Sequence, residues 1–353
     1  MSKISKLIND KQYYGGMTLA ERMQQRRTSA ISIATIENFE ICETYVHGVK
    51  RRKTKEAVTT DTLFQAASIS KPVFAVAVMR LVEQGVLDID VDISEYLTHY
   101  EVPTFDKQKY KITLKQLLSH HAGLNLHGFA GYLQGRKIPT VEQILNGAFL
   151  RANHSKLKVV TEPGTVFRYS GGGYVLAQKI VTDICKREFC DLMDDLVLAP
   201  FSMTNCTFSQ FLSKEQINEA AFGYNIFNLQ VPKGYRIMPE LSAAGLWATP
   251  SDLARFGIEI MKALKGESSL IEKSTAKRLT RKVSKYSPFG VGFSVSRGKK
   301  GLIFGHSGSN IGYKSNMSFC PKDGSGIVVM QNSDIGKHIC GEVTNAFREI
   351  CGW

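Results

Sequence analysis

The order of strand-like and helical segments constrains the fold of this 353-residue chain more than any single motif. Helical patterns fill most of the middle of the chain, whereas segments rich in β-branched residues occur near both ends. We therefore predict an α/β (α+β) fold, in which both ends of the chain build one central antiparallel sheet flanked by helices. Strands are expected at residues 30–36, 41–49, 290–296, 302–306, 315–320 and 326–331.

The middle of the chain consists of helices and loops. Helix starts are predicted at Thr113, Thr140 and Ser213, because each is followed three residues later by a glutamine that can complete a capping box. We predict an α-rich lobe at 87–240, inserted into a sheet-and-helix domain formed by 1–86 and 241–353, with the functional site between the lobes. Further helices are expected over 68–85, 175–190, 250–264 and 335–351.

The composition is that of a globular protein, with 43% hydrophobic residues and a net charge of +13. The basic stretch 51–55 lacks any nucleic-acid-binding motif, so no nucleic-acid partner is expected, although attraction to anionic surfaces or substrates stays open. The longest apolar run, 73–82, is about half a membrane span, so no integral membrane segment is expected. Residues 1–10 lack the apolar core of a secretion signal, which predicts a cytoplasmic protein, or a periplasmic one if an upstream segment was removed.

Metal and cofactor sites are not expected. The seven cysteines are scattered without a Cys-x-x-Cys pair and are predicted to be reduced thiols. His120, His121 and His127 lack the i, i+4 spacing of helical metal ligands. We therefore predict no metal and no cofactor.

The stretch from Phe64 to Pro72 contains the first candidate for catalysis. An apolar run ends at Ser68, and Lys71 follows three residues later, before a long apolar segment. If a helix begins near Ser68, the amine lies beside the hydroxyl at a helix N-terminus, where a neutral lysine can activate the serine. The alternative is a helix-capping serine with a surface lysine. The same spacing recurs in polar surroundings at Ser155/Lys158, Ser274/Lys277 and Ser296/Lys299.

Two later stretches add candidates. Tyr169 precedes the glycine run 171–173, whose freedom would bring the phenol close to another lobe, where it can relay protons. His306 and Gly308 stand near the end of a predicted strand whose backbone N–H groups can face a substrate. The alternatives are an ordinary helix-entry turn and a plain strand end with an exposed histidine.

Taken together and in this order, these motifs resemble the serine β-lactamase-like superfamily. The pattern is most similar to the branch of class C β-lactamases, family VIII esterases and D-aminopeptidases, which pairs Ser-x-x-Lys with a central Tyr-x-Asn-like and a late Lys- or His-x-Gly motif. The resemblance covers roughly residues 30–350. It includes the stretches 117–124, 163–167 and 243–254.

The resemblance implies a β-lactamase/transpeptidase-like fold and a role for each matched residue. Ser68 would be the acylated nucleophile, and Lys71 and Tyr169 would share the general base and acid work. The backbone N–H groups of Ser68 and Ser309 would form the oxyanion hole. The substrate would contact the matched residues Gly171, His306 and Gly308.

The physical chemistry of such a site adds two expectations. Burial between the lobes should lower the pKa of Lys71 toward neutrality. Tyr169, next to a cationic Lys71, should ionise more easily than a free phenol.

Two departures from the pattern concern the substrate. Gly171 stands where the lactamases carry an asparagine, and His306 stands where they carry a lysine and can form only a weaker, pH-dependent cation. We therefore predict a serine hydrolase, an esterase or amidase, whose partner is a small ester or amide substrate. The alternatives are a penicillin-binding protein, weak β-lactamase or D-Ala carboxypeptidase, and a non-enzymatic binding module with a basic surface.

Overall fold

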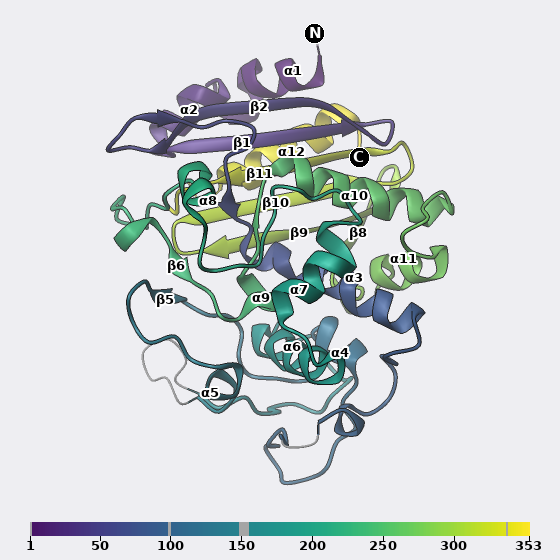
Figure 1. Cartoon of the computed structure of the whole chain (residues 1–353). Helices are drawn as coiled ribbons and strands as arrows, with labels where there is room; N and C mark the ends of the chain where they lie inside the picture. Colours follow the sequence, from purple (N-terminus) through teal and green to yellow (C-terminus); the bar gives the residue numbers. More distant parts are fainter. Residues whose placement is uncertain (1, 98–99, 148–154, 337) are drawn as a thin grey trace.

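The computed structural model describes residues 2–97, 100–147, 155–336 and 338–353. Its central element is a seven-stranded antiparallel sheet with the strand order β3-β2-β1-β11-β10-β9-β8 (Figure 1). The strands are β1 (Ala30–Glu37), β2 (Glu40–Arg51), β3 (Glu56–Ala57), β8 (Ser294–Gly298), β9 (Gly301–Asn310), β10 (Tyr313–Cys320) and β11 (Ser325–Gln331).

The two ends of the chain meet in the middle of this sheet. β1 pairs with β11, so that Ile31 lies opposite Gln331 and Ile36 lies opposite Gly326. The predicted sheet built from both chain ends is therefore confirmed.

Helices cover both faces of the sheet. Along β1, Ile31 and Ile33 point to one face and Ala34 to the other, as the two-residue period of a strand requires. The first face packs against α1, α2 and α12, and the second packs against α10. The twelve α-helices of the described residues are α1 (Lys3–Asn9), α2 (Leu19–Gln25), α3 (Ser70–Glu83), α4 (Leu114–Leu118), α5 (Val141–Leu145), α6 (Gly171–Cys185), α7 (Phe189–Met193), α8 (Lys214–Glu219), α9 (Leu241–Ala244), α10 (Pro250–Lys265), α11 (Lys273–Thr280) and α12 (Ile339–Cys351).

Local side-chain signals predicted several helix starts correctly. The capping boxes at Thr113, Thr140 and Ser213 are present, each with both of its reciprocal hydrogen bonds. The helix predicted from residue 175 begins earlier, at Gly171, because the Ser170 hydroxyl accepts the N–H of Gly173 and caps it.

Two further boundaries differ from the prediction. The strand expected from residue 290 begins only at Ser294, because the chain turns first through Gly292, whose φ is +90°. The last helix begins at Ile339 instead of 335.

Most of the segment 87–240 lies below the sheet in Figure 1, whereas α8 lies level with the strands. Its described residues contribute no strand to the seven-stranded sheet. Two small antiparallel pairs lie outside that sheet, one of β4 (Phe64–Gln65) with β7 (Trp247–Ala248) and one of β5 (Tyr132–Leu133) with β6 (Arg236–Ile237). The division into two lobes at 86/87 and 240/241 stays a prediction.

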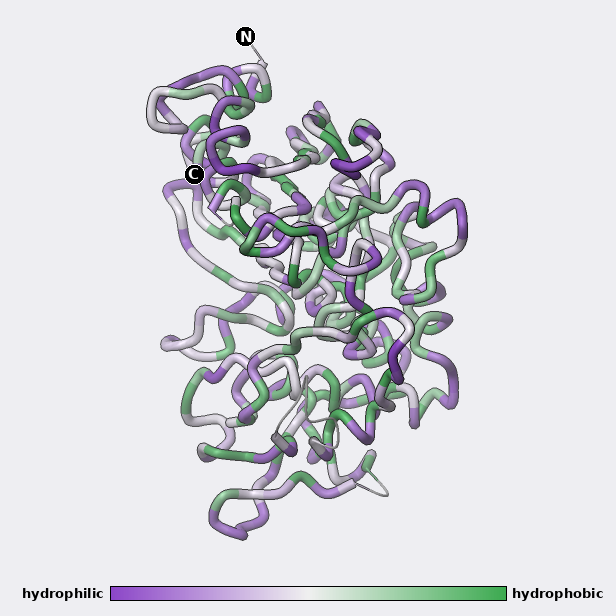
Figure 2. The backbone as a smooth tube through the Cα atoms, turned by 90° about the vertical axis from the view of Figure 1, so that its left-hand side faces the viewer, coloured by the Kyte–Doolittle hydropathy of each residue, from purple (hydrophilic) through white to green (hydrophobic). Residues whose placement is uncertain are grey.

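Helix α3 passes through the interior between these two parts. Its residues from Ser70 to Met79 are all buried. Many of the outermost turns of the chain are hydrophilic (purple in Figure 2). Within the described ranges, none of the helices has the length and hydropathy needed to cross a bilayer.

Candidate active site

Ser68 lies in a tight turn just before α3. β4 ends at Gln65, a 3-10 turn covers Ala67–Ile69, and the α-helix begins at Ser70, two residues later than predicted. Ala67 has a φ of +52°, a strained value for a residue with a side chain. The hydroxyl of Ser70 fixes this turn, since it donates to Ala67 O (2.6 Å) and accepts the N–H of Leu246 (2.9 Å).

Lys71 contacts the Ser68 hydroxyl from the first turn of α3. Its Nζ lies 3.0 Å from Ser68 Oγ and donates to Ala243 O at 2.6 Å. Burial lowers the pKa of Lys71 to about 7, which is the direction predicted from the sequence. Among the described residues, no carboxylate forms an ion pair with this amine. The amine therefore has a large neutral fraction at neutral pH and can accept a proton.

Tyr169 completes a cluster with Ser68 and Lys71. Its ring centroid lies 5.1 Å from Lys71 Nζ, and its phenol is hydrogen-bonded to Ser68. Burial raises the pKa of Tyr169 to about 12, and the hydrogen bond to Ser68 offsets only part of this effect. The expectation that Tyr169 ionises easily is therefore wrong, because desolvation of the phenolate outweighs its neighbours.

The glycine run 171–173 brings Tyr169 close to the cleft by close packing. None of the three glycines has a positive φ, so their backbone conformations do not require glycine. A Cβ at Gly172 would lie 2.7 Å from Leu126 Cβ, and one at Gly171 would lie 3.1 Å from both His127 O and the Phe129 ring. The absent side chains let the segment 126–129 lie directly on the N-terminus of α6.

Strand β9 forms the opposite wall of the site. A Cβ at Gly308 would lie 2.2 Å from Ala66 O, so only glycine lets β9 approach the turn that carries Ser68. β8 pairs with β9 only as far as Gly305, and no other described strand pairs with that edge beyond it. The edge from 306 to 310, including Ser309, is thus free to meet a substrate.

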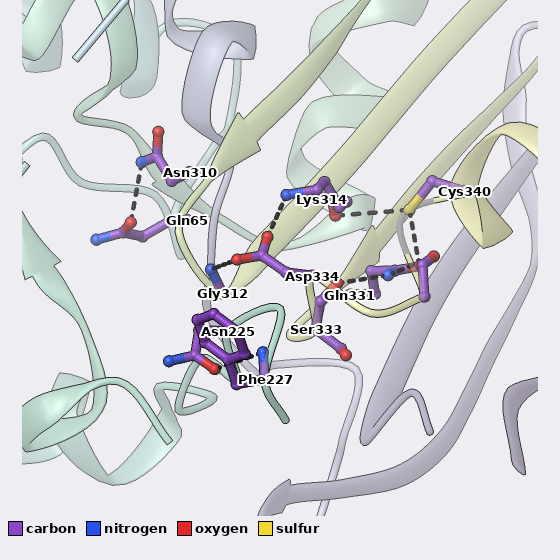
Figure 3. Close-up of polar contacts among 11 residues, drawn as sticks. Gln65, Asn225, Phe227, Asn310, Gly312, Lys314, Gln331, Ser333, Asp334 and Cys340 are labelled. Carbon is purple, nitrogen blue, oxygen red and sulfur yellow. Dashed lines mark hydrogen bonds and ion pairs between the residues drawn. The ribbon is translucent and has the colours of Figure 1, made fainter. Parts of the chain in front are cut away.

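The next residue of this wall, Asn310, is held in place by the other side of the site. Its Nδ2 donates to Gln65 Oε1 at 2.9 Å and to Ala244 O at 3.1 Å. Figure 3 shows Asn310 and Gln65 facing each other. The end of β9 is therefore tied both to the strand that leads to Ser68 and to α9.

His306 is buried and neutral. Its Nδ1 lies 2.6 Å from Ser307 O, so that this nitrogen carries the proton, and its Nε2 has no hydrogen-bond partner in the described residues. Burial, with a smaller contribution from the nearby Lys71, lowers the pKa of His306 to about 3. The predicted pH-dependent cation is therefore wrong for neutral pH, because the site desolvates the imidazole.

The sequence considered His120 only as a metal ligand, but the structure places it against Tyr169. The two rings stack with centroids 4.0 Å apart. His120 O accepts the N–H of Arg168 (2.8 Å), and His120 Nδ1 accepts the N–H of Ser170 (3.1 Å). His120 therefore holds the chain on both sides of Tyr169. The stretch 117–124, which carried part of the resemblance, was the signal that could have identified it.

One cleft, with a volume of about 960 Å³, brings the predicted residues together. All seven predicted site residues line it, as do His127, Phe129, Phe167, Phe289 and Ile311. Within the described part of the chain, no group of three or more His, Cys, Asp or Glu side chains is arranged to hold a metal ion. The cleft brings together a serine hydroxyl, an amine, a phenol and imidazoles.

Comparison with curated proteins gives relatives of low identity. Protein flp from Staphylococcus aureus (strain N315) is 24% identical over 338 residues, which cover 93% of this chain. The chain spans 64% of the length of flp.

Among solved structures, D-amino acid amidase from Ochrobactrum anthropi SV3 in complex with L-phenylalanine amide has a TM-score of 0.78 at 20% identity, with 99% of each chain covered. The octameric penicillin-binding protein homologue from Pyrococcus abyssi has a TM-score of 0.78 at 23% identity, covering 99% of this chain and 78% of that one. These similarities show the shared fold.

The family model described as Beta-lactamase matches residues 18–339, which is most of the chain and includes every residue of the cleft. The chain therefore belongs to the Beta-lactamase family.

Proposed function

We propose that this protein is a serine hydrolase that forms an acyl-enzyme on Ser68 and cleaves small, uncharged esters or amides. The observation that carries the proposal is the 3.0 Å contact between Ser68 Oγ and a buried Lys71 whose pKa is about 7. A neutral lysine amine has two N–H donors and one lone pair. One N–H is engaged by Ala243 O, and the lone pair is free to accept the serine proton.

The reaction follows from these contacts. As Ser68 Oγ attacks the substrate carbonyl, its proton passes to Lys71 Nζ, and the carbonyl oxygen becomes an oxyanion. The N–H groups of Ser68 and Ser309 are the proposed donors to that oxyanion. Tyr169, protonated at neutral pH, passes a proton to the leaving group and is reprotonated from Lys71. Water then attacks the acyl-enzyme through the reverse sequence of proton transfers.

The lining of the cleft supports an uncharged substrate. Among the described residues that line it, none is Asp, Glu or Arg, and His306 is neutral. A substrate carboxylate would find no permanent cation, and a substrate ammonium would find no carboxylate. Phe129, Phe167 and Phe289 offer aromatic surface for an apolar acyl group.

D-amino acid amidase, which shares the fold, makes amides of aromatic acids a reasonable part of a substrate panel. A free amino acid amide carries an ammonium group, however, and the described residues that line the cleft include no carboxylate to bind it. We therefore expect N-acylated or deaminated aromatic amides and esters to be better substrates than amino acid amides.

The proposal is tested with a fluorophosphonate probe and a panel of substrates. Intact-mass analysis should find one adduct, located at Ser68 by peptide mapping, and none in Ser68→Ala. The panel contains p-nitrophenyl phenylacetate, an analogue with a free carboxylate, D-phenylalanine amide and a chromogenic cephalosporin. Hydrolysis of the neutral ester by wild type, at least about 10³-fold above Ser68→Ala, supports the proposal.

Three outcomes would contradict it. Full esterase activity in Ser68→Ala would show that the reaction does not pass through an acyl-enzyme on Ser68. Preferred turnover of the cephalosporin would favour the β-lactamase alternative. Absence of both adduct and hydrolysis would favour a binding module.

A further inference from the structure

The turn between Tyr224 and Gln230 exposes three large apolar side chains, far more than is usual at one place on a protein surface. Ile226, Phe227 and Leu229 are 65%, 74% and 63% exposed. We call these three residues the apolar tip. Figure 1 shows the segment between α8 and β6, which contains them, projecting from the left edge of the molecule.

The apolar tip stands on a rigid turn. Asn225 Oδ1 accepts the N–H groups of Phe227 (2.9 Å) and Leu229 (3.1 Å), and the Asn225 N–H donates to Leu229 O (2.9 Å). At the base, Tyr224 O accepts the N–H of Asp334 at 2.8 Å, and Figure 3 shows Asn225 beside Phe227. These hydrogen bonds thus fix the turn in a conformation that keeps the three apolar side chains in solvent.

Basic residues lie in the segments that adjoin the apolar tip. Arg52 joins the turn to its neighbours, since its guanidinium donates to Asn228 and to Arg27 O. The segments 51–55 and 225–233 contain no acidic residue. We call the exposed cations of these two segments, together with Arg27, the cationic collar. They are Arg27, Lys53, Lys55 and Lys233.

We propose that the apolar tip and the cationic collar dock this protein onto an anionic lipid bilayer. Apolar side chains on a projecting turn can enter the interface of a bilayer, while cations of the adjoining segments meet anionic headgroups. The shape and the charge favour a bilayer over a second copy of the chain. A second copy would bring one cationic collar against another, and each chain already carries a net charge of +13.

The test is co-sedimentation of the full chain with vesicles of phosphatidylcholine, with and without about one third phosphatidylglycerol. We expect wild type to bind the anionic vesicles and to be released by high salt, because the collar contributes a screened attraction. Phe227→Ser/Leu229→Ser and Lys53→Glu/Lys55→Glu should each weaken binding by about tenfold or more. The matched control is Phe211→Ser, because Phe211 is 77% exposed on another loop.

All substituted side chains are exposed, so thermal unfolding and probe labelling of Ser68 should match wild type. The proposal fails if wild type stays in the supernatant with anionic vesicles, or if the tip variant binds as well as wild type. It also fails if Phe211→Ser loses as much binding as the tip variant. A change in sedimentation velocity of the lipid-free tip variant would assign the surface to self-association instead.

Discussion

The two walls of the cleft differ in how completely the chain satisfies their polar groups. On the wall that carries Ser68, the Lys71 amine contacts both Ser68 Oγ and Ala243 O. On the β9 wall, His306 Nε2 has no partner in the described residues, and the strand edge beyond Gly305 is unpaired. The Lys71 amine of the first wall is held in place by partners within the protein. The polar groups named for the second wall are available to a ligand. We therefore expect the Ser68 wall to govern proton transfer, and the β9 wall to govern substrate preference besides supplying the Ser309 N–H.

The largest effect that tests this difference is expected on the Ser68 wall. Tyr169→Phe removes the phenolic proton while keeping the ring and its stacking on His120. We expect kcat for the neutral ester to fall by about 10²- to 10³-fold with little change in KM, because proton transfer to the leaving group is lost. Steady-state kinetics measure this split. Equal activity in wild type and Tyr169→Phe would show that Tyr169 does not transfer a proton in the reaction.

A smaller effect is expected for His120, which positions Tyr169 without touching the substrate. His120→Phe keeps an aromatic ring but loses the acceptor for the Ser170 N–H, and should lower kcat by about 10- to 100-fold. His120→Asn offers an acceptor again and should recover part of that loss. Thermal unfolding of both variants controls for general destabilisation. A kcat loss that simply follows stability, with no recovery in His120→Asn, would contradict the positioning role.

The pH dependence tests which group on the two walls titrates. Lys71 must be neutral to act as base, and its pKa is about 7, so kcat/KM should fall about tenfold per pH unit below 7 and level off above it. The pKa of His306 is about 3, so this residue should add no inflection near neutrality. His306→Asn is therefore the matched control and should keep the inflection near 7. Its disappearance in that variant would assign the titration to His306.

The smallest effect is a change of preference on the β9 wall. His306→Lys restores a cation at the substrate edge and should raise kcat/KM for the carboxylate-bearing ester relative to the neutral one by about tenfold. Acylation of Ser68 by the fluorophosphonate should change little, because that wall is untouched. An equal loss for both esters would mean that the two walls are not independent.

The sequence predicted what depends on local chemistry and long periodic segments. The capping boxes at Thr113, Thr140 and Ser213 require only a few neighbouring residues. The pairing of β1 with β11 followed from β-branched segments at both ends of the chain.

Other features depend on packing between distant segments. The stacking of His120 on Tyr169 was missed because it brings together residues that are 49 positions apart in the chain (169 − 120). The protonation of Tyr169 and His306 was also mispredicted, because the degree of desolvation depends on which side chains surround each group.

The pairing of β1 with β11 also affects folding during synthesis of the chain. During translation, β1 and α3 emerge long before their partners, since 288 residues separate Glu37 from Ser325 (325 − 37). At about 5 to 20 residues per second, the nascent β1 edge waits roughly 15 to 60 seconds for its neighbour. For most of that interval Ser309 has not been made, and Lys71 has no complete interior around it. The proposed acylation site is therefore incomplete for most of translation, and the unpaired β1 edge is where a chaperone would be needed.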